Sequence, residues 1–344
     1  SYCYSAKGRN NTVMKWEIAK VALDFFIDNN RIDNKHLSLF ISGGGEPLAS
    51  WPLTKRIIEY ARKRSVEQGF LMTISVITNG SLITPEIADV LRDNSCIVGV
   101  SFEVLEDLQN LQRMMWQKVN ENIHLLHDRG VVVKMNSTIT PASVGRMEEM
   151  LLTVAREYPF LAEYTMEPVT SVDIFEDAGQ LGTFYSRYFE SYIKCAEQAK
   201  KKNLNLRFTF DDAMRGITPR HCPGKFCVTP TGWISVCHLV SSPKEERFSD
   251  CVYGEVDDAG VSVDKEKFDH LYGINVMSYD RCRDCFAKWD CGGECMTRNA
   301  IYPESYLAEV CKFNKRFISH ALMKKVAEAI YNEFGVTLQE YVAN

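Results

Sequence analysis

Strand-like and helix-like segments alternate along the first half of the chain, and this alternation limits the possible folds more than any other feature. The segments between the strands carry apolar residues three and four positions apart, the pattern of a helix with one buried face. A strand, helix, strand order implies right-handed crossovers and a parallel sheet. Short apolar runs, typical of buried strands, lie at 36–42, 72–78, 96–102, 131–140 and 162–169.

The helices that complete this pattern are predicted around those strands. Thr84 is placed to cap one of them, with Pro85 at its first position. No glycine fingerprint of a dinucleotide-binding fold follows a strand, so a β/α barrel, whole or partial, is favoured over a doubly wound sheet. The alternation stops after about residue 218. The other helices are expected at 12–30, 52–67, 107–128, 142–157 and about 180–202, with a last one at about 315–334.

Polar residues end each of the five strands. GGGEP (43–47) follows the first strand directly, and its glycines let the backbone approach a ligand closely. In a parallel β/α barrel the carboxyl ends of the strands form the mouth where enzymes build their sites. Ordinary turn chemistry is the alternative interpretation. The other four ends carry Thr78, Asn79 and Gly80, then Ser101 and Glu103, then Asn136 and Ser137, and finally Glu167 and Pro168.

The composition is that of a globular protein, and it argues against two classes of function. Of 344 residues, 45% are hydrophobic, and the net charge is −5. Nucleic-acid-binding proteins usually show an excess or a stripe of basic residues, so no nucleic acid is expected as a partner. No apolar run approaches the roughly 20 residues of a membrane span, so no membrane association is expected. No signal peptide is visible, and a cytoplasmic location is predicted.

Cysteine is the most unusual component of the chain. Nine of the twelve cysteines lie between positions 222 and 311. The run CRDCFAKWDCGGEC (282–295) has the spacing C-x2-C-x5-C-x3-C, and Gly292 and Gly293 permit a tight turn within it. Secreted disulfide frameworks belong to short chains, so we interpret these thiols as metal ligands in a reducing compartment. Tetrahedral zinc and a [4Fe–4S] cluster each take four thiolates, and the spacing alone favours neither.

The cysteine pattern resembles the signature of a known domain. Cys222-x9-Gly232-x4-Cys237, followed by the 282–295 run and by Cys311, is similar to the seven-cysteine signature of the SPASM domain. This domain extends one branch of the radical S-adenosylmethionine (radical SAM) enzymes and carries two auxiliary [4Fe–4S] clusters. GGGEP in turn resembles the GGEP loop of those enzymes. The resemblance implies an α/β fold with a partial (β/α)6 barrel at 1–217, a cysteine-rich SPASM domain at 218–315 and a closing helix at 316–344.

The resemblance also implies ligands for the two auxiliary clusters. The fourth ligand of the inner cluster varies in the family. Cys227 is our choice because it lies in the same loop as Cys222, and Cys251 or an open iron that receives substrate are the alternatives. The remaining inner ligands would be Cys222, Cys237 and Cys295, and the outer cluster would be held by Cys282, Cys285, Cys291 and Cys311.

The SAM site follows from the same resemblance. The family's GGEP loop holds the amino group of the methionine moiety, a role that would fall on Gly43, Gly44, Gly45 and Glu46. The family contacts the ribose and the carboxylate of SAM at positions that match Asn79, Ser101 and Asn136.

Ser1-Tyr2-Cys3 matches the last three positions of the family's motif C-x3-C-x-aromatic-C. Cys3 would then be catalytic, as the third ligand of the SAM-binding [4Fe–4S] cluster, with Tyr2 beside the adenine. The first strand and the other two cysteines of the motif are expected upstream of Ser1.

The resemblance implies radical chemistry. One electron, from a donor of flavodoxin or ferredoxin type, cleaves SAM to methionine and a 5′-deoxyadenosyl radical, which abstracts a hydrogen atom from the substrate. Because the family mostly modifies peptides and proteins, a maturase of a ribosomal precursor peptide is expected. The alternatives are a sulfatase maturase that forms formylglycine, a dehydrogenase of small molecules, and a non-catalytic protein stapled by zinc.

Four further residues are expected to be structural. Cys96 lies in a strand and Cys195 in a helix, and both are interpreted as packed thiols. His221 and His238 flank predicted ligands, and they are expected to donate hydrogen bonds to the site rather than to bind metal.

Overall fold

The chain forms two compact units in the computed structural model, which describes residues 12–42, 44–210 and 216–343. Three of the predicted site residues, Tyr2, Cys3 and Gly43, lie outside the described residues. The first unit consists of Ser1–Ser171, Ser191–Arg207 and Gly224–Gly273, and the second consists of Val172–Glu190, Phe208–Pro223 and Ile274–Asn344.

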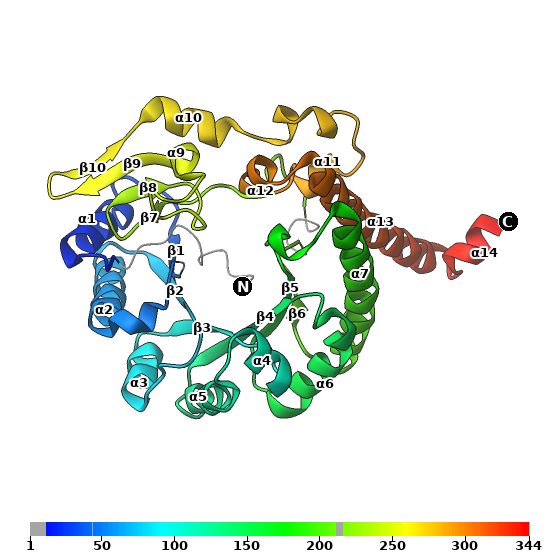
Figure 1. Cartoon of the computed structure of the whole chain (residues 1–344), viewed down its shortest axis with the longest axis horizontal. Helices are drawn as coiled ribbons and strands as arrows, with labels where there is room; N and C mark the ends of the chain where they lie inside the picture. Colours follow the sequence, from blue (N-terminus) through cyan, green and yellow to red (C-terminus); the bar gives the residue numbers. More distant parts are fainter. Residues whose placement is uncertain (1–11, 43, 211–215, 344) are drawn as a thin grey trace. The chain divides into compact units, whose positions relative to one another are not determined.

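A parallel six-stranded sheet is the centre of the first unit (Figure 1). The strands follow sequence order, and β1 and β6 form the two edges, so the sheet is open. The predicted α/β fold with a partial barrel is confirmed. The last strand was not predicted, because two residues are too few to give an apolar run. The strands are β1 (His36–Ile41), β2 (Leu71–Thr78), β3 (Cys96–Ser101), β4 (Val132–Ile139), β5 (Glu163–Pro168) and β6 (Leu206–Arg207).

The two faces of this sheet differ in chemistry, because successive side chains of a strand point to opposite sides. One face is apolar, and side chains such as Val76 and Val98 are fully buried there. Helices α2 (Trp51–Glu67), α3 (Pro85–Asp93) and α5 (Trp116–Asp128) contact β2, β3 and β4 and lie outside the curved sheet in Figure 1. The strand register places polar residues on the opposite face: Ser75, Ser101, Lys134, Asn136, Glu163, Thr165 and Arg207.

Most helices of the first half lie where the sequence predicts them. Thr84 caps α3, since its hydroxyl oxygen accepts a hydrogen bond from Ile87 N at 3.3 Å. The single helix expected at 107–128 was wrong, because Met114 and Met115 have φ of +68° and +58°, a left-handed backbone that no helix can continue. Its place is taken by α4 (Glu106–Gln112) and α5, and the other helices are α1 (Trp16–Phe26), α6 (Met147–Glu157) and α7 (Ala178–Lys201).

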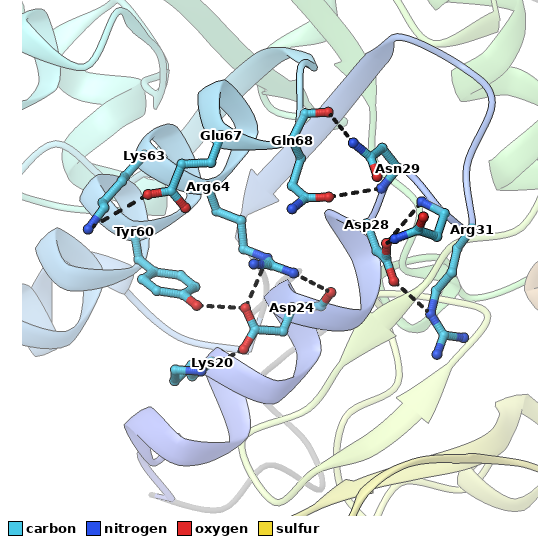
Figure 2. Close-up of polar contacts among 11 residues, drawn as sticks. Lys20, Asp24, Asp28, Asn29, Arg31, Tyr60, Lys63, Arg64, Glu67 and Gln68 are labelled. Carbon is cyan, nitrogen blue, oxygen red and sulfur yellow. Dashed lines mark hydrogen bonds and ion pairs between the residues drawn. The ribbon is translucent and has the colours of Figure 1, made fainter.

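Polar contacts tie α1 to α2 (Figure 2). The carboxylate of Asp24 accepts a hydrogen bond from the Tyr60 hydroxyl at 2.6 Å and pairs with Lys20 at 2.6 Å and Arg64 at 2.9 Å. Burial raises the pKa of Asp24, but these three partners outweigh burial, and the pKa lies below its usual value. Asp24 therefore fixes α1 on α2 in its ionised form.

A small antiparallel sheet also belongs to the first unit, in the order β10-β9-β8-β7. Gly232 forms the turn before β8 with φ +95°, and a Cβ there would lie 2.3 Å from the carbonyl oxygen of Val256. Only glycine fits this turn. The strands are β7 (Cys227–Val228), β8 (Trp233–Ser235), β9 (Val252–Asp257) and β10 (Gly260–Val263), and the helices beside them are α9 (Phe248–Cys251) and α10 (Lys265–Gly273).

Helices and aromatic side chains dominate the second unit. Phe313 packs on Phe317 and Tyr188, with ring centroids 5.0 Å and 5.7 Å apart. The closing helix predicted at about 315–334 is confirmed as α13 (Glu304–Phe334), although it begins earlier. Among the described residues, no helix is both long and apolar enough to cross a membrane. The shorter helices are α11 (Lys288–Cys291), α12 (Met296–Ile301) and α14 (Leu338–Ala343).

Candidate functional site

The GGGEP loop meets the end of β2 through Glu46. Its Oε1 accepts hydrogen bonds from Thr78 Oγ1 at 2.7 Å and Leu48 N at 3.1 Å, and its Oε2 accepts one from Asn79 N at 2.7 Å. A carboxylate offers about four lone-pair positions, so these three donors leave room for one more. The bond from Leu48 N makes Glu46 the N-cap of the short helix η2 (Pro47–Ser50). Glu46 therefore has a structural role as well as capacity for a ligand.

Gly44 and Gly45 have backbone features that suit the approach of a ligand. Gly44 has φ +57°, in the left-handed region that favours glycine. A Cβ added at Gly45 would meet no atom of the described residues within 4 Å. Among the described residues, no atom blocks the close approach of a ligand to Gly45 on this side.

Two residues predicted to contact SAM lie side by side on adjacent strands of the main sheet. Ser101 pairs in register with Asn136, and Thr165 and Arg207 continue this row across β5 and β6. We call these four residues the polar row. Gly99 lies on the same face as Ser101, and a Cβ there would come within 3.2 Å of Asn136 Nδ2. The structure thus brings Ser101 and Asn136 together, while Asn79 follows the end of β2.

Charged side chains beside the polar row were missed from the sequence. Lys134 Nζ lies 3.2 Å from Glu163 Oε1, and Arg207 Nη1 lies 3.9 Å from Glu163 Oε2. The signal was available in the alternation of β4, where Lys134, Asn136 and Thr138 recur at every second position. Two cations and one carboxylate therefore lie on the polar face of the sheet.

Glu103 fixes the segment that follows β3. It is fully buried, and its carboxylate accepts hydrogen bonds from Arg113 Nε at 2.7 Å and Thr138 N at 3.0 Å. Arg113 also donates to Thr138 Oγ1 at 3.2 Å. A buried carboxylate is stable only when it is paired in this way. The pair anchors the segment with left-handed Met114 and Met115 to β4.

Three candidate ligands lie in or beside the small sheet of the first unit: Cys227 in β7, Cys237 after the end of β8 and Cys251 at the end of α9. Cys227 pairs opposite Ser235, and Cys237 follows two residues later along the chain. Val236 N donates to the carbonyl oxygen of Cys251 at 2.9 Å, which places Cys251 beside the same segment. Both Cys227 and its alternative Cys251 therefore neighbour the segment that carries Cys237, and the choice between them stays a prediction.

The second unit contains the four predicted ligands of the outer cluster. Burial raises the pKa of Cys282, and the nearby thiols of Cys311 and Cys285 raise it further. Burial likewise raises the pKa of Cys291 to about 12, with a contribution from Cys311. Cys311 therefore lies near both Cys282 and Cys291, and Cys285 lies near Cys282. Two of the predicted inner ligands, Cys222 and Cys295, also belong to this unit.

A buried polar network adjoins the Cys291 thiol. Glu294 lies three residues later, and its carboxylate accepts hydrogen bonds from Arg298 Nη1 at 3.0 Å and Asn314 Nδ2 at 2.5 Å. Asn314 Nδ2 also donates to Cys291 Sγ at 3.5 Å. Burial raises the pKa of Glu294, but the charge of Arg298 and the bond from Asn314 help to outweigh it and lower the pKa to about 2.

Arg281 lies beside two of the same thiols. Burial raises the pKa of Cys282 and Cys311, and the guanidinium charge opposes this rise at both. Its Nε and Nη2 are buried and have no hydrogen-bond partner among the residues that the structure describes. Buried cationic groups are costly unless an anion compensates them, so this position suits an anionic group.

Two cysteines outside the predicted sites and the two histidines beside predicted ligands have different surroundings. Cys96 and Cys195 are buried, and burial raises their pKa to about 11 and about 12. His238 Nδ1 lies 2.9 Å from Lys225 Nζ, and His221 Nδ1 is buried without a partner among the described residues. Their predicted bonds to ligand thiols stay a prediction.

Within the described parts of the chain, no three side chains of His, Cys, Asp or Glu are grouped as ligands of a single metal ion. In a [4Fe–4S] cluster each thiolate binds a different iron. Such thiolates therefore stand farther apart than the ligands of one ion.

Comparison with protein families identifies the first part of the chain. Residues 1–154 match the Radical SAM superfamily. The chain carries a radical SAM domain. A radical SAM domain binds S-adenosylmethionine and a [4Fe–4S] cluster. All residues predicted to contact SAM, from Tyr2 to Asn136, lie within this domain.

Two curated relatives extend this match. An uncharacterised protein of Methanocaldococcus jannaschii is 32% identical over 105 residues, which are 30% of this chain and 34% of that protein. The radical SAM cyclopropyl synthase TigE of Paramaledivibacter caminithermalis is 18% identical over 284 residues, 77% of this chain and 55% of TigE. The chain thus matches about a third and about half of the length of these relatives.

Solved structures show that the likeness in fold extends beyond the radical SAM domain. Native anSMEcpe with bound AdoMet and Kp18Cys peptide matches with a TM-score of 0.73 and 17% identity, over 96% of this chain and 95% of that one. SuiB of Streptococcus suis matches with a TM-score of 0.55 and 14% identity, over 87% and 73%. The cysteine-rich region therefore shares their fold.

The residues of the second unit suit the group that the resemblance implies. Four thiolates and a [4Fe–4S] core carry a net negative charge in the usual oxidation states. Such an anion would compensate Arg281, whose buried Nε and Nη2 lack partners among the described residues. The donor set of four cysteines is also the one that such clusters prefer.

Proposed function

We propose that the chain is a radical SAM enzyme that modifies a peptide or protein substrate and carries two auxiliary [4Fe–4S] clusters. The observation that carries the proposal is the likeness in fold over 96% of the chain to anSMEcpe, whose structure contains both AdoMet and a peptide. The radical SAM domain and the gathered thiols of the second unit support it independently.

The residues at the mouth of the sheet bind and orient SAM in this proposal. Cys3 would help to hold the cluster at which SAM binds, and SAM bound there would provide a 5′-deoxyadenosyl radical for removal of hydrogen from the substrate. Glu46 receives the ammonium group of SAM at its remaining acceptor position. The hydrogen bonds from Thr78 and Asn79 keep the Glu46 carboxylate in place. Ser101 and Asn136 present hydroxyl and amide groups to the polar parts of SAM.

The cysteines of the C-terminal half have the assignments that the resemblance implies. Cys282, Cys285, Cys291 and Cys311 bind the outer cluster. Cys222, Cys237 and Cys295 bind the inner one, with Cys227 as the fourth ligand. The clusters require a one-electron donor of flavodoxin or ferredoxin type outside the chain.

The experiment is a hydrogen-abstraction assay with reduced, cluster-loaded protein under anaerobic conditions. A pool of synthetic peptides that contain Cys, Ser and Tyr is compared with a pool of small alcohols and sugars, and 5′-deoxyadenosine is measured together with the mass of each peptide. We expect peptides to stimulate the release of 5′-deoxyadenosine and to lose hydrogen. Stimulation by the small molecules alone would contradict the proposal and favour a dehydrogenase. Conversion of Cys or Ser to formylglycine would identify the reaction as sulfatase maturation.

A further inference from the structure

The amide group of Asn314 can take only one orientation. Its Nδ2 lies 2.5 Å from Glu294 Oε2, and an ionised carboxylate can only accept hydrogen bonds. The amide nitrogen, and not the amide oxygen, must therefore face Glu294. Arg298 Nη1 holds the other carboxylate oxygen at 3.0 Å and keeps this partner ionised and in place. Because Asn314 is only 3% exposed, water does not compete for the bond.

The second hydrogen of the same nitrogen is directed at a predicted cluster ligand. Asn314 Nδ2 lies 3.5 Å from Cys291 Sγ, within the range of an N–H···S hydrogen bond. An amide nitrogen carries two hydrogens, so Asn314 serves Glu294 and Cys291 at once. Helices α11 and α13, which carry Cys291 and Asn314, contact each other in the second unit.

We propose that Asn314 raises the reduction potential of the outer auxiliary cluster through its hydrogen bond to Cys291 Sγ. The inference rests on the proposed function, because it needs a cluster at the four outer thiolates. A hydrogen bond to a ligating sulfur withdraws electron density from it, which stabilises the reduced cluster. Asn314 acts through Cys291 Sγ, so it is a positioning and tuning residue rather than a catalytic one.

Glu294 acts in the opposite direction on the same cluster. Its negative charge lies one amide group away from Cys291 Sγ and disfavours addition of an electron to a cluster that is already anionic. It also fixes the orientation of Asn314, as argued above. The two side chains therefore oppose each other electrostatically while they depend on each other geometrically.

Two substitutions with opposite expected signs separate tuning from packing. Asn314→Leu removes both hydrogens at nearly constant volume, and the potential should become more negative. Glu294→Gln removes the charge at constant shape, and the potential should become more positive. Phe317→Leu is the matched control, because Phe317 lies on the same helix but packs on Phe189 and Phe208. Loss of packing by itself should not shift the potential.

The measurement is a potentiometric titration of the anaerobic, cluster-loaded protein, followed by electron paramagnetic resonance and by iron content. The signal that Cys285→Ser abolishes identifies the outer cluster. At a fixed potential near the midpoint, we expect the ratio of reduced to oxidised cluster to fall several-fold in Asn314→Leu and to rise in Glu294→Gln. A tenfold change in this ratio corresponds to about 59 mV for a one-electron couple.

The outcomes distinguish the inference from the proposed function. If Cys285→Ser loses no iron, no outer cluster exists and both fail. If that variant loses iron but Asn314→Leu and Glu294→Gln leave the potential unchanged or shift it in the same direction, the inference alone fails. Should Asn314→Leu not retain the cluster, Asn314→Ala replaces it. Loss of the cluster in both Asn314 variants but not in Phe317→Leu would assign Asn314 to cluster retention and overturn the tuning role.

Discussion

Glu46 shows how one residue combines a structural contact with capacity for a ligand. Three donors of the chain hold its carboxylate, and one acceptor position remains. Glu46→Gln keeps the size of the side chain but loses the charge that would pair with the ammonium group of SAM. A hydrogen bond to a charged group contributes about 1.5–3 kcal/mol, so the Kd of SAM should rise by about tenfold or more. Equilibrium dialysis with cluster-loaded protein measures this Kd.

Asp89→Asn is the matched control for Glu46→Gln. Asp89 is a carboxylate of the same unit that pairs with Arg92 and Arg129 at the surface, so its loss should leave the Kd of SAM unchanged. Equal Kd values for Glu46→Gln and wild type would show that Glu46 is a helix cap alone.

Asp24 gives a pH-dependent prediction at the same scale. Its folded-state pKa lies below the usual value, so its contribution is present above the unfolded pKa of about 4 and is lost as pH falls through the folded pKa. Asp24→Asn should therefore lower the free energy of unfolding by about 1–2 kcal/mol at neutral pH, because Tyr60, Lys20 and Arg64 then lose their contacts with a charged carboxylate. The difference from wild type should shrink towards zero in acid. Urea unfolding at several pH values measures it.

The comparison that checks this prediction is Asp269→Asn. Asp269 pairs only with Lys265 among the residues described, both side chains are mostly exposed, and such pairs contribute little. A cost of Asp24→Asn that is the same at all pH values, or no greater than that of Asp269→Asn, would contradict the role given to the ionised Asp24.

The turn at Gly232 is an element-scale feature that the cysteine signature depends on. A Cβ at this position would lie 2.3 Å from a backbone oxygen of β9, and the backbone is left-handed. Gly232→Ala should cost about 2 kcal/mol or more in free energy of unfolding, because a backbone atom cannot move aside cheaply. It should also lower the iron content, since the turn separates Cys227 from Cys237. Urea unfolding and iron analysis measure both effects.

Gly273→Ala controls for the change from glycine to alanine. A Cβ at Gly273 would meet no described atom within 4 Å, so this variant should have wild-type stability and iron content. Stability of Gly232→Ala equal to that of the control would mean that the β7–β8 turn is not as tight as the structure has it.

The secondary-structure elements were predictable where the pattern of apolar residues matched the backbone conformation. Strands β1 to β5 were recognised because each carries an apolar run, whereas β6 is too short to carry a pattern. The prediction that β1 is buried was wrong, since Leu37 is its one buried residue. The break between α4 and α5 gave no signal, because methionine does not mark a left-handed backbone. Ser101 and Asn136 were predicted as SAM contacts from the resemblance and their places at strand ends, and this stays a prediction. The pair of Lys134 and Glu163 was not predicted, because it depends on the register between β4 and β5.

At the scale of the whole molecule, the prediction concerns the iron held by the cysteines that are predicted cluster ligands. Substitution of an outer ligand, as in Cys282→Ala, and of an inner one, as in Cys222→Ala, should each lower the iron content of anaerobically reconstituted protein by about four atoms per chain. Colourless protein with stoichiometric zinc and little iron would instead support a zinc-stapled interaction protein. Substitution of the packed thiol Cys195 with alanine, which is expected to leave the iron content unchanged, is the control.

The interpretation of the whole molecule came from the spacing of the cysteines, which can be read directly from the sequence. Side-chain networks are different, because they depend on helices that meet only in the folded chain. Asn314 lies 23 residues from Cys291, and nothing in the sequence marks it as a donor to that sulfur. Glu294 stood within the recognised run, yet its role was missed, because Arg298 and Asn314 become its partners only through folding.

Release of 5′-deoxyadenosine by the full-length, cluster-loaded and chemically reduced protein tests the central claim most directly. Chromatography with mass detection quantifies the product after incubation with SAM, for wild type and for Cys3→Ala. The radical SAM assignment predicts that wild type forms 5′-deoxyadenosine and that Cys3→Ala, without the third cluster ligand, does not. No product from iron-loaded wild type, or equal product from Cys3→Ala, would contradict it.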